Sequence, residues 1–110
     1  MPHKKTGFQA VLAVPSVVKN HTVIELEAQL LFWDPVKLKN RPLAGKTVYF
    51  YQGNLLLKSA TTDEGGWAKA NVPVNANNLK RPRSVIFTAA FRAEWEFQGA
   101  SRNGTFTVVP

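Results

Sequence analysis

The sequence predicts an all-β protein in which seven short antiparallel strands form a sandwich of two sheets. Apolar and polar residues alternate from Thr22 to Phe32, and they alternate again from Thr47 to Tyr51. Between residues 41 and 72, Gly53-Asn54 and Asp63-Glu64-Gly65-Gly66 supply the residue types that tight turns require. Alternating segments joined by such turns are typical of a sandwich and not of a helical protein.

Each strand is predicted from its own pattern. The seven ranges are 8–14, 22–32, 46–51, 55–62, 67–74, 84–93 and 105–109. Pro15 ends the first strand and favours an edge position for it. The second contains good helix formers, but its polar residues Glu25, Glu27 and Gln29 share one face only if the segment is a strand. The third is rich in β-branched and aromatic residues, and the fourth lies between the two turns. The last three alternate through small apolar, phenylalanine and valine residues.

The same alternation predicts which side chains form the core. These are Leu12, Ile24, Leu26, Leu30, Val48, Phe50, Val72, Phe87, Phe91, Phe106 and Val108.

Size and composition predict one domain. The chain has 110 residues, of which 45% are hydrophobic, so we expect a flexible tail over residues 1–7 and a single domain over 8–110. No cysteine is present, so disulfides and thiolate metal ligands are excluded. No apolar run approaches the roughly 20 residues that cross a bilayer, and no convincing signal peptide is visible.

Catalytic and metal chemistry find little support in the sequence. His3 and His21 are the only histidines, and no nucleophile-elbow or phosphate-binding glycine pattern occurs. We therefore expect no enzyme, no metal and no cofactor. Asp63, which could contribute to a calcium site, is interpreted as a turn residue that binds its own backbone.

Strand direction places three tryptophans at one end of the predicted sandwich. Trp33, Trp67 and Trp95 belong to connections that share this end, together with Asp34 and Glu94. Exposed tryptophan beside carboxylates can bind carbohydrate, because the ring stacks on a sugar and the acids accept hydrogen bonds. The alternative is that these rings cover the core or pack on a neighbouring domain.

The opposite end is predicted to be basic. Lys19 lies in one connection there, and Lys80, Arg81 and Arg83 lie in another, in a chain whose net charge is +7. Such a cluster can bind phosphate, sulfate or another polyanion. Sequence-specific recognition of nucleic acid is not expected, because this end offers almost no aromatic side chains for stacking.

Three segments resemble the immunoglobulin-like repeat domains of bacterial and archaeal surface proteins. They are RPLAGKTVYFY (41–51), TTDEGGWAKANV (61–72), and FTAAFRA (87–93) with the later TFTVV (105–109). One departure is Glu94–Gln98, which stands in place of a short acidic or glycine-rich corner and leaves the strand register beyond Arg92 open.

The resemblance implies a seven-strand antiparallel immunoglobulin-like β-sandwich. It also implies a non-catalytic structural or adhesion module of a larger cell-surface or secreted protein, which acts as a spacer or a binding surface. Its partners would be neighbouring domains of the same chain or other surface proteins, with a glycan or a polyanion as further candidates.

Overall fold

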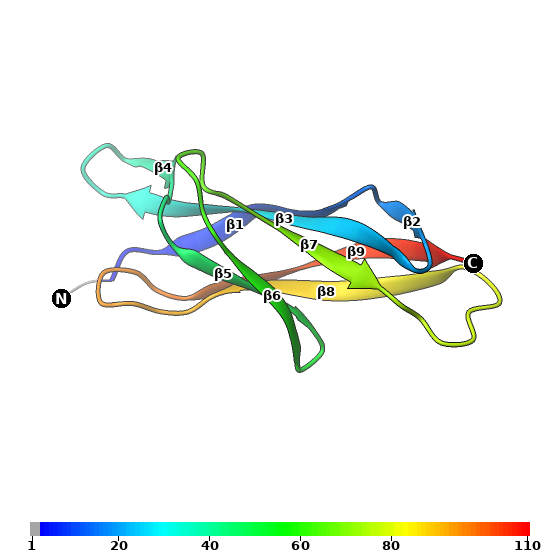
Figure 1. The fold of residues 1–110 in the computed structure, drawn as a ribbon. Helices are drawn as coiled ribbons and strands as arrows, with labels where there is room; N and C mark the ends of the chain where they lie inside the picture. Colours follow the sequence, from blue (N-terminus) through cyan, green and yellow to red (C-terminus); the bar gives the residue numbers. More distant parts are fainter. Residues whose placement is uncertain (1–2) are drawn as a thin grey trace.

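A computed structural model describes residues 3–110 and has two β-sheets, with no helix among those residues (Figure 1). The predicted all-β, two-layer architecture is therefore confirmed. The strands are β1 (Thr6–Val14), β2 (Val17–Lys19), β3 (Thr22–Asp34), β4 (Lys39–Pro42), β5 (Thr47–Gln52), β6 (Leu55–Thr61), β7 (Trp67–Val74), β8 (Arg83–Phe91) and β9 (Ala100–Val109). Since no helix is present in this part of the chain, none there could cross a membrane.

The first sheet is built around β3. Its long alternating sequence buries every second side chain, and β1 runs antiparallel along one side of it. Two strands share the other side: β7 pairs with Thr22–Gln29, and β4 pairs with Leu31–Asp34. One strand of the sheet therefore positions the other three.

The second sheet has the order β2-β9-β8-β5-β6. Its pairs are antiparallel except that of β2 with β9, which is parallel. The chain leaves the first sheet after β1 and enters the second at β2, which ties the layers together on the flank where β1 lies against β9. The molecule measures 53 × 23 × 18 Å, and the first described residues lie at the end opposite the C-terminus (Figure 1).

The core between the layers is centred on three aromatic rings. Phe87 lies 6.4 Å from Phe50 and 6.1 Å from Phe106, measured between ring centroids. Ten of the eleven predicted core residues are buried, and the exception is Leu12, which is 37% exposed.

A β-bulge explains the wrong prediction for Leu12. The register between β1 and β3 shifts between Phe8 and Ala10, so the strand changes phase after Phe8 and buries Ala13 instead of Leu12. Arg102 on β9 holds this bulge, because its guanidinium donates to the carbonyl oxygens of Phe8 and Gln9 at 3.0 and 2.9 Å.

The strand boundaries differ from the prediction in several places. Residues 3–110 form nine strands instead of the predicted seven, the additional two being the short β2 and β4. β1 begins at Thr6, inside the segment expected to be a tail, and Lys4 is already hydrogen-bonded to residues 96 and 98; residues 1–2 lie outside the described part. β8 ends at Phe91 and β9 begins at Ala100, which settles the open register beyond Arg92.

Gly66 lies beside Leu30, the residue of β3 at which pairing with β7 ends and pairing with β4 begins. Leu30 donates its N–H to the oxygen of Gly66, and the oxygen of Leu30 accepts the N–H of Leu43. Gly66 has φ +81°, and a Cβ added there would lie 2.5 Å from the oxygen of Leu30. This contact with backbone cannot be relieved by a side-chain rotation.

We predict that Gly66→Ala lowers the free energy of unfolding by at least about 2 kcal/mol, because it adds a backbone clash to the cost of a left-handed conformation. Urea denaturation measures this change. Gly7→Ala is the matched control, since no atom lies within 4 Å of its added Cβ and its φ is not positive. Equal stability of the two variants would contradict the tight approach at Gly66.

Candidate functional site

The end of the sandwich that carries the N-terminus holds the connections β3–β4 and β8–β9, as the strand directions predict (Figure 1). Backbone hydrogen bonds join them through the N-terminal segment: Trp33 donates to Lys5, and Lys4 donates to Glu96. We call this end the tryptophan pole and define it by His3–Lys5, Trp33–Lys39 and Glu94–Gln98.

Two of the three predicted tryptophans lie at this pole, each beside the N-terminal segment. Trp33 is 39% exposed and Trp95 is 71% exposed, and the Trp95 ring centroid lies 6.5 Å from that of His3. A cavity of about 570 Å³ is lined by His3, Lys4, Lys5, Trp33 and Pro35. Trp67 lies elsewhere, on the outer face of the first sheet opposite Gln29, and is half-buried. The structure therefore places Trp33 and Trp95, but not Trp67, at the predicted end.

The acidic side chains of the tryptophan pole are engaged by the protein itself. Asp34 accepts hydrogen bonds from the N–H groups of Val36 and Lys37 at 2.9 and 3.2 Å, and Arg41 approaches its other oxygen at 3.1 Å. Glu94 pairs with Lys46 at 2.7 Å, and Glu96 pairs with Lys4 at 3.8 Å. This pole is therefore not a free acidic surface.

Asp63 is a turn residue, as predicted. Its Oδ1 accepts the N–H groups of Gly65 and Trp67, both at 2.9 Å. Among residues 3–110, no group of three or more metal-ligating side chains comes together.

The ring that covers the core at this pole is Phe97, which the sequence interpretation left without a role. Phe97 is buried, packs edge-on against Phe32 with centroids 5.6 Å apart, and lies beneath the ammonium groups of Lys4 and Lys46. The alternative interpretation of the sequence had the tryptophan rings, and not Phe97, covering the core at this end. Of Trp95, Glu96 and Phe97, only Phe97 is buried, and strict alternation would have placed Trp95 on the same face, so no pattern in the sequence distinguishes the two rings.

At the opposite end lie the segments that carry four exposed cations, and we call this end the basic pole and define it by Lys19, Lys80, Arg81 and Arg83 (Figure 1). Lys19 pairs with Val109 and Arg83 with Val108, so the first and last of these cations flank neighbouring positions of β9. The loops that carry them are joined by Asn20, whose side chain exchanges two 2.8 Å hydrogen bonds with the backbone of Ala76. No ion pair within residues 3–110 includes any of the four cations.

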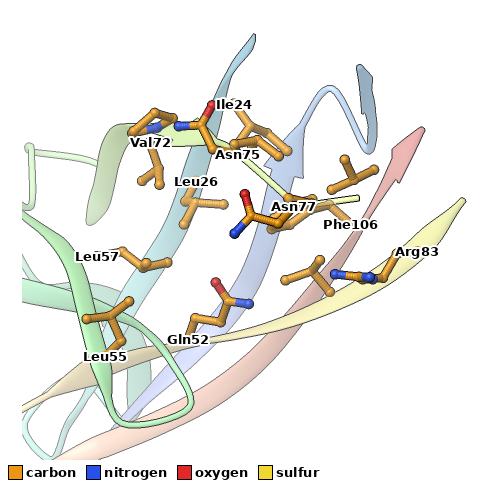
Figure 2. A pocket seen from close by; sticks show the side chains of 15 residues that line it. Ile24, Leu26, Gln52, Leu55, Leu57, Val72, Asn75, Asn77, Arg83 and Phe106 are labelled. Carbon is orange, nitrogen blue, oxygen red and sulfur yellow. The ribbon is translucent and has the colours of Figure 1, made fainter. Parts of the chain in front are cut away.

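A groove of about 460 Å³ opens between the two layers beside the basic pole (Figure 2). Its position follows from the fold, because the tip of the β5–β6 hairpin turns away from the end of β7 and leaves the layers uncovered there (Figure 1). The walls are apolar and come from both sheets: Ile24, Leu26 and Val72 from the first, and Leu55, Leu57, Val85, Phe106 and Val108 from the second. We call this space the inter-sheet groove.

Polar side chains reach the inter-sheet groove from three segments. Figure 2 shows Gln52 from the hairpin, Asn77 from the β7–β8 loop and Arg83 from β8 pointing toward the same space. Asn75 is oriented by His21, whose Nδ1 lies 3.1 Å from its Oδ1. No Asp or Glu side chain lines the groove. An apolar space with a few converging polar groups is the usual form of a small-ligand site.

Comparisons with known proteins identify the fold only. No family model matches the chain, and no curated protein sequence matches it. The structure is similar to that of the Pseudomonas fluorescens alkylpurine DNA glycosylase AlkC bound to DNA containing an abasic site analog, with a TM-score of 0.53 and 13% sequence identity. The similarity covers 96% of this chain and 30% of the glycosylase, so it concerns a part of that protein.

We predict that Asp34 links stability to pH. Its hydrogen bonds from Lys37, Arg41 and Val36 hold the pKa of the carboxyl below 3.8, the ordinary value for an aspartate. Because the pKa is lower in the folded state than in the unfolded state, the ionised carboxylate stabilises the fold at pH values above 3.8. This stability is lost as the pH falls through the lowered pKa of the folded state. Thermal melts from pH 2 to 7 should show that Asp34→Asn is less stable than the wild type at pH 7 and that the difference shrinks in acid. Glu64→Gln, at an exposed carboxylate, is the control. A difference that does not change with pH would contradict the role of the Asp34 charge.

Proposed function

We propose that this chain is a non-catalytic immunoglobulin-like module of a larger cell-surface or secreted protein, and that it binds an anionic ligand at the basic pole. The strand order supports the fold part of the proposal. β1, β3 and β7 correspond to strands A, B and E of an immunoglobulin domain, whereas β5, β8 and β9 correspond to C, F and G. β6 corresponds to C′, because it pairs with β5 and extends the second sheet.

The exposed positive charge of the basic pole supports the proposed binding of an anionic ligand. Lys19, Lys80, Arg81 and Arg83 are exposed, and no acidic side chain is paired with them among residues 3–110. At the tryptophan pole, by contrast, three carboxylates are paired with basic side chains. Unpaired cations on one surface attract polyanions, and arginine adds bidentate hydrogen bonds to sulfate, phosphate or carboxylate.

We predict that a heparin decasaccharide binds at the basic pole. The triple variant Lys80→Gln, Arg81→Gln, Arg83→Gln should bind it at least roughly tenfold more weakly and with a weaker dependence on salt, because three ionic contacts are removed. Calorimetric titration at several salt concentrations measures both effects.

The matched control removes the same charge from the other pole. Lys5→Gln, Lys37→Gln, Lys39→Gln changes three exposed lysines that are in no ion pair among residues 3–110. If this control weakens heparin binding as much as the basic-pole variant does, binding depends on net charge and not on the basic pole.

A second candidate function is carbohydrate binding at the tryptophan pole, and the exposure of Trp95 and Trp33 favours it. A neutral oligosaccharide that stacks on these rings should change the tryptophan fluorescence saturably. Trp33→Ala and Trp95→Ala should each remove most of the change, whereas Trp67→Ala should keep the affinity because Trp67 lies on a different face. Fluorescence that stays constant across a panel of neutral glycans would exclude this function.

A further inference from the structure

We propose that the inter-sheet groove binds a single-chain amphiphile, with its carboxylate on Arg83 and its hydrocarbon chain between the layers. This proposal rests on the proposed anion binding at the basic pole, and it names a ligand class for one part of that pole. A medium-chain fatty acid is the simplest molecule of this class.

The walls of the groove fit a hydrocarbon chain. Aliphatic side chains and Phe106 form the apolar part of the walls, beside Gln52, Asn75, Asn77 and Arg83, and Ile24, Leu26 and Val108 lie at the floor. Leu55 is 65% exposed at the outer lip, where an apolar ligand would cover it. Burial of the ligand chain and of this leucine gives the favourable free energy of binding.

The rim of the groove fits a carboxylate. Among residues 3–110, the Arg83 side chain has no ion pair and no hydrogen-bond partner, so its N–H donors are available to a ligand. Arginine binds a carboxylate with two parallel hydrogen bonds, and the amides of Gln52 and Asn77 lie around the same space (Figure 2). Because no acidic side chain lines the groove, one cation there attracts a ligand with one negative charge.

An added peptide strand is a poorer occupant, because the edge of β7 that borders the groove is protected. Pro73 has no N–H to donate. The oxygen of Asn71 accepts a hydrogen bond from Lys58 Nζ at 3.2 Å, and both backbone groups of Trp67 are bonded to Asp63. These are alternate positions of one strand, so the row of backbone groups that a docking strand would need is interrupted.

The test titrates the whole chain with hexanoate, octanoate and decanoate below their critical micelle concentrations. Affinity should rise with each added methylene, by up to roughly fourfold for one that is fully buried. The side-chain amide signals of Gln52, Asn75 and Asn77 in ¹H–¹⁵N spectra should shift saturably. Affinity that is independent of chain length, or shifts confined to other residues, would overturn the proposal.

Variants separate the head group from the chain. Arg83→Gln should weaken decanoate binding about tenfold or more, since a charge-assisted pair is lost, whereas Lys39→Gln, which removes one exposed charge from the tryptophan pole, should have little effect. Leu55→Ser, at an exposed position, should reduce the gain between octanoate and decanoate without disturbing the fold. Equal effects of Lys39→Gln and Arg83→Gln would contradict the head-group assignment.

The outcome distinguishes this proposal from the broader one. If heparin binds at the basic pole and the fatty acids do not bind, the anion-binding function stands and the amphiphile proposal fails. If decanoate binds in the groove and heparin does not bind, the anion-binding function is confined to the groove. If neither binds, both proposals fail.

Discussion

The pairing of β3 with strands on both of its sides is the constraint on which the rest of the structure depends. Its alternating side chains place Ile24, Leu26 and Leu30 between the layers, and its backbone aligns β1, β7 and β4. β7 and β4 pair with successive parts of the same side of β3. The change of partner occurs at Leu30, where Gly66 packs closely against the backbone of β3. Each end of β3 then builds a different pole: Trp33 and Asp34 lie at one, and the floor of the groove begins at Ile24 at the other.

Much of this fold could be predicted from the period-two pattern, because burial of one face leaves a strong trace in strands such as β3, β7 and β8. β1 could not be predicted fully. A bulge inserts one residue without a distinctive sequence signal, and every side chain after it changes face, so Leu12 and Ala13 exchanged their predicted positions. β2 and β4 were missed because strands of three or four residues are too short to show a period.

The candidate sites were predicted to the extent that topology alone determines them. Strand direction places Lys19 near Arg83, since both flank the end of β9. The inter-sheet groove could not be predicted, because it depends on how far the β5–β6 hairpin diverges from β7, and Gln52 and Asn77 carry no pattern that marks them as lining residues. The tryptophans show the same limit. Their end of the molecule follows from topology, but the choice of Phe97 over Trp95 as the buried ring depends on the path of the chain after Phe91.

The two poles differ in their acidic side chains, and this difference argues for function at one of them. At the tryptophan pole, Asp34 organises a turn and Glu94 and Glu96 neutralise Lys46 and Lys4, so all three carboxylates stabilise the fold, while Lys5, Lys37 and Lys39 are in no ion pair among residues 3–110. At the basic pole, no carboxylate among the described residues is paired with the four cations, and repulsion between like charges at one end of the molecule opposes folding. A local arrangement that costs stability is characteristic of a binding site, because the missing opposite charge is supplied by the ligand. The exposed apolar side chain of Leu55 at the inter-sheet groove supports the same conclusion, because a ligand bound in the groove would remove this side chain from water.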